Sequence, residues 1–214
     1  MTLSEDTHTS HGASRSEPHA SSTSSQLSSA QALPELKTRI KAGLRTYPDF
    51  PKKGILFEDI FPLFSSHSLH QDLIRAYELQ ILESFGPGNT PDVIVGLDAR
   101  GFLFGPTLAL KFGAGFVPVR KEGKLPGRLE TATYEKEYGT DTFAIQADSI
   151  QPGQKVLIVD DLIATGGSAS AAGTLVNKCG GTLLGYIFII ELTFLGGRNK
   201  LNAPVYTLLE SQSE

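Results

Sequence analysis

The chain has 214 residues, of which 40% are hydrophobic and 20% are charged, and it carries a formal net charge of -4. This length favours one globular domain with a terminal tail. The slightly acidic balance, with no stripe of Lys and Arg, argues against a general nucleic-acid surface. No apolar run approaches the roughly 20 residues that span a bilayer, so we expect a soluble protein with no membrane partner.

Cysteine usage points in the same direction. The sequence contains a single cysteine, Cys179, which excludes an intramolecular disulfide and a zinc site built from several thiolates. A lone cysteine is most often a packed, inert thiol. This usage is typical of a reducing compartment, and we expect a cytoplasmic protein, with which a nuclear fraction is compatible.

Residues 1–32 are rich in Ser and Thr and lack periodic apolar positions. This composition predicts a disordered tail, because it buries too little apolar surface to offset the entropy of ordering. A transit peptide is the alternative, but such peptides are rich in Arg and poor in acids. The tail instead carries Glu5, Asp6 and Glu17 against the single basic residue Arg15. The predicted domain therefore covers residues 33–214.

Order is expected to begin near Leu33, where apolar residues recur at helical spacing as far as Leu44. Pro48 and Pro51 then predict an extended stretch, because proline fixes its own φ and restricts the residue before it. Ser68, with Gln71 three residues later, has the pattern of a capping box and predicts the start of a second helix. We expect this helix to end near Gly86.

The remainder of the chain alternates between two patterns. Continuous apolar runs, bounded by Gly, Pro or Asp, predict strands over residues 93–97, 116–119, 155–159 and 186–190. Helices are predicted between them, over residues 102–111 and 169–178. Uninterrupted apolarity indicates strands that are buried on both faces, as in parallel sheets. The sequence thus predicts an α/β domain with a doubly wound, mainly parallel sheet flanked by helices, in which ligands bind beyond the carboxyl ends of the strands.

The run VLIVDDLIATGGS, residues 156–168, combines two kinds of binding group. Asp160 and Asp161 end a predicted strand, and a turn over residues 164–168 opens the next helix. Backbone N–H groups at such a turn, together with the helix dipole, favour a phosphate. The carboxylates would repel that phosphate, so we expect them to face neutral hydroxyls or a cation. A ribose 5-phosphate satisfies both groups.

Other readings of this run fit less well. A Walker A loop needs a Gly-Lys-Ser/Thr sequence, and a dinucleotide-binding strand–turn–helix needs G-x-G-x-x-G; neither is present. A receiver domain carries its acidic pair on its first strand, whereas three predicted strands precede Asp160. The plain structural alternative is a tight turn that is capped by Thr165.

With these residues in view, the run resembles the phosphoribosyl-pyrophosphate signature of the type I phosphoribosyltransferases. Five further stretches, residues 50–60, 95–106, 119–127, 134–139 and 191–201, are similar to the members of that family that act on adenine. The resemblance extends from about residue 36 to residue 209. It implies the type I phosphoribosyltransferase fold, with a small hood and a flexible lid, and a homodimer. It also implies a purine-salvage reaction in which adenine and 5-phosphoribosyl 1-pyrophosphate (PRPP) give AMP and pyrophosphate.

The resemblance further implies roles for individual residues. Mg²⁺ would be held mainly by substrate and water, with no dedicated protein ligands. Glu137 would exchange a proton with the purine, and Tyr138 would lie beside it in a lid that runs from Lys121 to about Thr140. Ribose and phosphate binding falls to Asp160, Asp161, Ala164, Thr165, Gly166, Gly167 and Ser168. Pyrophosphate binding falls to Arg100, Arg120, Lys121 and Lys124, of which Arg100 and Lys124 also assist catalysis.

The expected adenine-binding residues are Leu56, Phe57, Glu58 and Leu192. Phe57 matches an aromatic residue that stacks on the purine, although a Phe among aliphatic neighbours is more often part of a core. The backbone of Leu56 would read the amino edge of the base, and Leu192 would line the other ring face. Glu58 departs from members that carry Arg at this position. Its carboxylate would either accept a hydrogen bond from an amino group or face water.

Two other functions remain open at this stage. Hypoxanthine and guanine phosphoribosyltransferases place a lysine near the penultimate strand to meet the 6-oxo group, and residues 189–195 contain none. A non-catalytic regulator that senses PRPP would need a nucleic-acid-binding appendage. The only appendage here is the Ser-rich tail, which has almost no basic residues.

Overall fold

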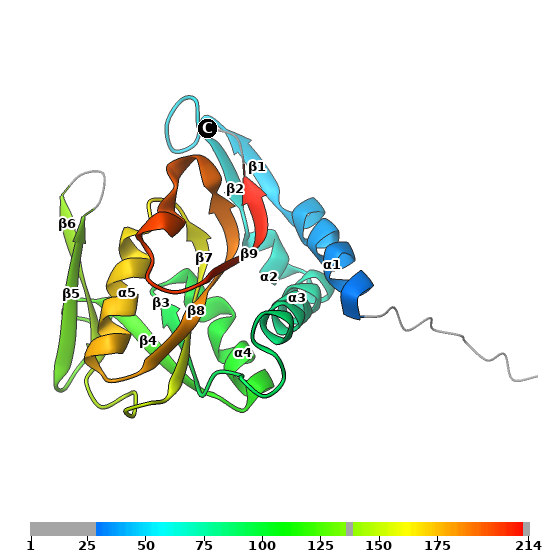
Figure 1. Cartoon of the computed structure of the whole chain (residues 1–214). Helices are drawn as coiled ribbons and strands as arrows, with labels where there is room; N and C mark the ends of the chain where they lie inside the picture. Colours follow the sequence, from blue (N-terminus) through cyan, green and yellow to red (C-terminus); the bar gives the residue numbers. More distant parts are fainter. Residues whose placement is uncertain (1–28, 136–138, 212–214) are drawn as a thin grey trace, which may run out of the picture.

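The computed structural model of the chain describes residues 29–135 and 139–211 (Figure 1). Most of the predicted tail, residues 1–28, lies outside this range. Helix α1 (Ser29–Gly43) begins before the expected start at Leu33. Leu33, Leu36 and Ile40 are buried along one side of it, as their spacing predicts.

The described residues contain a seven-stranded sheet with the strand order β5-β6-β4-β3-β7-β8-β9. The strand bounds are β3 (Val93–Leu97), β4 (Gly115–Lys121), β5 (Leu129–Glu135), β6 (Thr140–Gln146), β7 (Lys155–Ile163), β8 (Thr182–Leu192) and β9 (Val205–Ser211). Strands β4, β3, β7, β8 and β9 are parallel, whereas β6 and β5 extend the sheet as an antiparallel hairpin beyond β4. The predicted mainly parallel sheet is confirmed.

Helices cover both faces of the parallel strands, as the apolar runs predict. Helices α1, α3 (His67–Phe85) and α4 (Gly105–Phe112) lie on one face, and α5 (Gly167–Lys178) lies on the other (Figure 1). Alternate residues of β7 serve the two layers: Leu157 joins the core with α1, α3 and α4, and Ile158 joins the core with α5. Cys179, at the end of α5, is buried in this second core, as expected of a packed thiol.

A small antiparallel pair forms the predicted hood. Strands β1 (Arg45–Pro48) and β2 (Leu56–Asp59) pair with each other, and the short helix α2 (Phe61–Ser65) follows them. The pair stands near the carboxyl ends of β8 and β9 (Figure 1). The extended stretch predicted around Pro48 and Pro51 lies at the end of β1 and in the turn that follows it.

Two predicted helix starts are wrong. Helix α3 is capped by Ser66, which has an extended backbone and accepts the N–H of Leu69 with its side-chain Oγ, whereas Ser68 already lies inside the helix. The predicted helix over residues 102–111 is divided into a 3₁₀ turn, η1 (Arg100–Leu103), and α4. Pro106 lies in the first turn of α4, where a helix tolerates proline because its N–H would have no partner there.

The strands differ from prediction mainly in length. Strand β7 continues past Val159, because residues as far as Ile163 remain paired with β8. Strands β1, β2, β5, β6 and β9 are not among the predicted strands. Strand β5 is only half-buried along its length, so it lacks the continuous apolarity on which the other strands were predicted. No helix within the two described ranges is long and apolar enough to cross a membrane.

Gly173 tests the packing of α5 against the sheet. Gly to Ala normally stabilises a helix interior, but a Cβ at position 173 would overlap the hydroxyl of Tyr186 in β8. We therefore expect Gly173→Ala to lower the free energy of unfolding by about 1–3 kcal/mol, the usual cost of overpacking. Urea denaturation monitored by circular dichroism measures this change.

Tyr186→Phe supplies the matched background for that measurement. It removes the overlapping hydroxyl, which donates to Asn202 Oδ1 at 3.0 Å, and leaves ring carbon Cζ as the nearest atom at 3.2 Å. In this background Gly173→Ala should be nearly neutral. Equal destabilisation in both backgrounds would contradict the packing argument.

Candidate active site

The loops after β3 and β7 form one crevice. These strands are parallel neighbours, and the chain leaves β3 toward β4 but returns to β7 on the other side of β3. Such a reversal opens a gap between the loops at the carboxyl ends of the strands, where α/β sheets bind ligands. Asp98 and Arg100 follow β3, and the turn over residues 164–168 follows β7. The structure thus brings Arg100 and the predicted phosphate turn to the same edge.

Two adjacent carboxylates lie in this crevice. Asp161 is 4% exposed, and its Oδ2 lies 2.9 Å from Nε of Arg100. Burial raises the pKa of Asp161, and the Arg100 charge opposes that shift. Part of Asp160 reaches solvent, but burial raises its pKa well above the usual range, and the charge of Asp161 adds to this. A cation or hydroxyl donors at this position would favour the ionised pair.

Tyr77, from α3, lies close enough to the acidic pair to sense its charge. Its side chain is fully buried and stacks on Phe104, with ring centroids 5.0 Å apart, and its hydroxyl makes no hydrogen bond with the described residues. Burial raises the pKa of Tyr77, and the charges of Asp161 and Asp160 raise it further. Tyr77 is not among the site residues predicted from the sequence. Its hydroxyl, among the buried apolar residues of α3, was the signal available.

The phosphate turn has the backbone that its sequence predicts. Gly166 has a φ of 78°, in the left-handed region that favours glycine, and it caps α5, where Ser170 N donates to Gly166 O at 2.9 Å. Thr165 and Ser168 are partly exposed on either side of it. The first N–H groups of the 12-residue helix therefore have no partner within the helix and are available to an anion.

Three of the four predicted pyrophosphate residues, Arg100, Arg120 and Lys121, form ion pairs with acidic side chains. Arg120, in β4, donates from Nε to Asp98 Oδ2 at 2.8 Å and from Nη1 to the carbonyl oxygen of Lys124 at 3.3 Å. Lys121 Nζ lies 3.2 Å from Asp141 Oδ2 in β6, and Lys124 is exposed in the turn after β4. All four predicted pyrophosphate residues thus follow or end β3 or β4. Their role in binding stays a prediction.

An apolar pocket adjoins the acidic pair. Its walls come from the hood (Ile55, Leu56, Phe57, Glu58), from the ends of β7 and β8 (Leu162, Ile190, Leu192), and from Arg100 and Asp161. All four residues predicted to bind adenine line this one pocket. The ring of Phe57 lies 5.1 Å from that of Phe50 in an edge-to-face arrangement. Flat apolar walls with polar groups at one end suit a planar base that is attached to a ribose.

The expected lid, from Lys121 to about Thr140, contains strand β5 and ends where β6 begins. Strand β5 lies against α5, where Lys178 Nζ donates to the carbonyl oxygen of Thr131 at 2.6 Å. At its end, the carbonyl oxygen of Glu135 would lie 3.0 Å from a Cβ on Gly167, so the hairpin reaches the phosphate turn. Glu137 and Tyr138 lie outside the described residues. Their predicted roles are therefore untested.

Mg²⁺ would find oxygen donors here but not a complete cage. No three His, Cys, Asp or Glu side chains within residues 29–135 and 139–211 are grouped closely enough to hold a metal ion. Asp160 and Asp161 offer two carboxylates beside the phosphate turn, the donor type that Mg²⁺ prefers. The residues present fit an ion whose other ligands are substrate oxygens and water.

Comparisons with known proteins agree with this site. Residues 65–210 match the family model described as a phosphoribosyl transferase domain. An adenine phosphoribosyltransferase of Yarrowia lipolytica is 61% identical over 181 residues, which is 85% of this chain and 99% of the relative. The crystal structure of adenine phosphoribosyltransferase from Saccharomyces cerevisiae, complexed with an imino-altritol bisphosphate and adenine, is 58% identical, with a TM-score of 0.80. It covers 82% of this chain, and the match covers 99% of the yeast chain.

A more distant structure shows the same fold with other bound molecules. The adenine phosphoribosyl transferase from Trypanosoma brucei, in complex with AMP, pyrophosphate and ribose-5-phosphate, is 26% identical, with a TM-score of 0.73. The match covers 82% of this chain and 79% of that chain. The fold is thus shared at low as well as at high identity.

The raised pKa of Asp160 predicts that ionisation of this carboxyl lowers the stability of the folded protein, to an extent that depends on pH. Between the ordinary value of 3.8 and the raised value, the folded state keeps a proton that the unfolded state has lost. The free energy of unfolding therefore falls as pH rises through this window. Asp160→Asn avoids that cost, so we expect it to raise the free energy of unfolding by about 1 kcal/mol near pH 7.5.

Urea denaturation at several pH values checks this expectation. The gain from Asp160→Asn should shrink as the pH falls toward about pH 3, below the ordinary pKa of 3.8, where the wild-type carboxyl is mostly protonated in both states. Glu35→Gln, which replaces an exposed carboxylate in α1, serves as the control and should show no comparable gain. If the difference in the free energy of unfolding between Asp160→Asn and the wild type is the same at every pH, burial does not raise the pKa of Asp160.

Proposed function

The chain belongs to the phosphoribosyl transferase family, from which we infer that it transfers ribose 5-phosphate from PRPP to N9 of adenine and releases AMP and pyrophosphate. This is a reaction of purine salvage. The observation that carries the assignment is one crevice in which a phosphate turn, an acidic pair and an apolar pocket adjoin one another. The most similar proteins reported above are adenine phosphoribosyltransferases, which this chain matches along nearly their whole length.

The crevice separates the charges of the reaction. The turn over residues 164–168 binds the 5-phosphate, and Asp160 and Asp161 accept hydrogen bonds from the ribose hydroxyls. As the bond from C1 to pyrophosphate oxygen breaks, positive charge develops on the ribose beside the two carboxylates. Negative charge leaves with the pyrophosphate toward the side of the basic residues, Arg100, Arg120, Lys121 and Lys124. Mg²⁺, when bound with the donor, neutralises part of that charge.

The remaining roles in this proposal fall to the segment that precedes β6. Adenine must lose a proton as N9 bonds to C1, and Glu137 is the carboxylate that we assign to accept it. Tyr138 lies beside it in sequence, and the segment from Lys121 to about Thr140 acts as the lid that excludes water. The reach of the hairpin to Gly167 supports this assignment, because it places the end of β5 over the phosphate turn.

The base pocket favours adenine over a 6-oxopurine. On β8, Ile190 and Leu192 line the pocket, whereas Glu191 between them is paired with Arg198 outside it. The β8 wall therefore offers no ammonium group to a 6-oxo oxygen. Glu58 lines the same pocket and presents a carboxylate, which accepts hydrogen bonds from an amino group. Loss of a matched hydrogen-bond partner commonly costs enzymes several orders of magnitude in specificity.

Steady-state assays with PRPP and either adenine or hypoxanthine test the assignment. We expect kcat/KM for adenine to exceed that for hypoxanthine by at least about 10³-fold, because the β8 wall of the pocket offers no ammonium group to the 6-oxo oxygen. AMP and pyrophosphate should appear in equal amounts. A preference for hypoxanthine would overturn the adenine assignment, and PRPP binding without AMP formation would point to a regulator.

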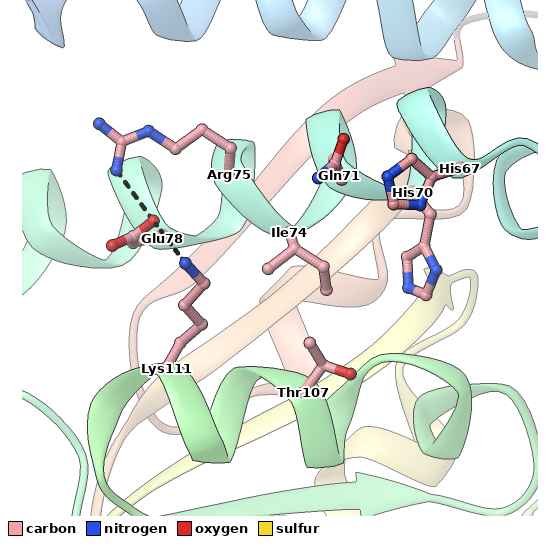
Figure 2. Close-up of a pocket in the computed structure, with 8 residues that line it drawn as sticks. All are labelled: His67, His70, Gln71, Ile74, Arg75, Glu78, Thr107 and Lys111. Atoms are coloured by element: carbon pink, nitrogen blue, oxygen red, sulfur yellow. Dashed lines mark hydrogen bonds and ion pairs between the residues drawn. The ribbon is translucent and has the colours of Figure 1, made fainter.

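We also propose that the protein works in the cytoplasm as a homodimer. The single buried thiol supports a reducing compartment. For the dimer, Leu110 in α4 is an exposed apolar side chain, with an exposed fraction of 84%, and Leu103 at the end of η1 is 39% exposed. A groove between α3 and α4 is lined by His67, His70, Gln71, Ile74, Arg75, Glu78, Thr107 and Lys111 (Figure 2). Lys111 of α4 approaches Glu78 of α3 across the groove, and Arg75 pairs with Glu78 along α3.

Leu110→Glu tests whether a second copy covers this face. A charge at the centre of an apolar interface is desolvated without a partner, so the variant should sediment as a monomer where the wild type sediments as a dimer. Analytical ultracentrifugation at matched concentrations measures the difference. Thr174→Glu, on the exposed side of α5, should remain dimeric. If the Leu110→Glu and Thr174→Glu variants form dimers of equal stability, α4 does not lie in the interface.

A further inference from the structure

The end of β8 carries a buried ion pair that faces away from the base pocket. Glu191 is 2% exposed, and Arg198 binds it through two hydrogen bonds. Nε of Arg198 donates to Oε1 at 2.7 Å, and Nη2 donates to Oε2. This pairing raises the pKa of Arg198, so the guanidinium stays charged. Sequence reasoning proposed no role for either residue.

The arginine belongs to a segment whose start is held by Thr193, which donates from Oγ1 to the carbonyl oxygen of Ser211 at 3.1 Å. Residues 193–200 form two 3₁₀ turns, η2 (Thr193–Leu195) and η3 (Gly197–Lys200), around Gly196, whose φ is 60°. Phe194 and Leu195 are 43% and 39% exposed and anchor the segment weakly. Arg198 connects η3 back to the strand from which the segment departs. A paired arginine fork has strict geometry and therefore limits where η3 can lie.

This segment touches the phosphate turn backbone to backbone. A Cβ on Gly197 would overlap the carbonyl oxygen of Ala164 and would lie 2.8 Å from the N of Gly166. A Cβ on Gly166 would in turn overlap the carbonyl oxygen of Gly197. No side chain fits between the two segments. The position of Gly197 therefore restricts the path of the chain through residues 164–166, whose N–H groups the phosphate needs.

The register between β7 and β8 places Glu191 of the ion pair next to the start of the phosphate turn. Glu191 pairs in register with Ile163, the last residue of β7, and Ala164 follows directly. Glu191, Arg198, Gly197 and Gly166 thus form a continuous chain of contacts from β8 to the start of α5. An unpaired carboxylate at the buried position of Glu191 would be unfavourable, so loss of Arg198 would rearrange this region.

We infer that Glu191 and Arg198 are positioning residues that hold the phosphate turn in its binding geometry. This inference rests on the proposed function, since it assigns the turn to the 5-phosphate of PRPP and AMP. The pair touches neither the base pocket nor the acidic pair. Its loss should therefore weaken the binding of phosphorylated ligands and leave the recognition of the base nearly unchanged.

Arg198→Met and Arg198→Lys test the inference in the full-length protein. Arg198→Met removes the fork, and we expect the dissociation constant for AMP, measured by calorimetry, and the KM for PRPP to rise about tenfold to hundredfold, since a displaced binding group commonly costs this much. The KM for adenine should change less than about twofold. Arg198→Lys keeps the charge but not the fork, so it should fold and recover part of the affinity.

Arg39→Met is the matched control. Arg39 makes the same kind of fork with Asp72, at 2.8 and 2.9 Å, and its side chain is 46% exposed against 44% for Arg198, but it connects α1 to α3. Its loss should lower the melting temperature without changing the KM for PRPP. If Arg198→Met and Arg198→Lys lower only the melting temperature, or if Arg39→Met weakens AMP binding equally, the pair is merely structural and the inference is wrong. Failure of the wild type to bind AMP would instead overturn the proposed function.

Discussion

The rest of the site depends on the burial of two adjacent carboxylates at the end of a central strand. Burial raises the pKa of both carboxyl groups, and the charge of Asp161 raises the pKa of Asp160 further. The neighbouring loop brings Arg100 to Asp161, where its charge opposes the effect of burial. Ionisation of the pair is therefore costly, and the ribose hydroxyls and the metal ion that we propose to bind here would favour the ionised form.

Parallel topology explains why the partners of this pair come from distant parts of the sequence. Arg100 precedes Asp161 by about 60 residues, yet β3 and β7 are neighbours in register, so the loops that follow them meet. The hood approaches from the other end of the chain and closes the base pocket against β8. The proposed phosphate, ribose and base sites thus lie close together at one edge of the sheet.

The sequence predicted the parallel strands and the phosphate turn because each has a local signature. Continuous apolar runs identified β3, β4, β7 and β8, and the Thr-Gly-Gly-Ser turn required a left-handed Gly166. The half-buried β5 has no such pattern, and its position depends on α5. The contact of Gly197 with Gly166 could not be predicted either. Two backbones that approach closely require glycine, but a glycine in the sequence does not identify the segment that it contacts.

The hairpin β5–β6 has a consequence for how the protein can evolve. It joins the parallel sheet through two rungs, in which Arg120 pairs with Ala144 and Lys121 with Phe143. The side chains of these rungs are also two of the cations assigned to pyrophosphate. Lys121 also pairs through Nζ with Asp141 of β6, so a substitution of this residue would affect both the attachment of the hairpin and the proposed affinity for the leaving group. Substitutions should therefore accumulate at the ends of β5 and β6 that lie away from β4, because residues there contribute neither to the attachment of the hairpin nor to the affinity for pyrophosphate.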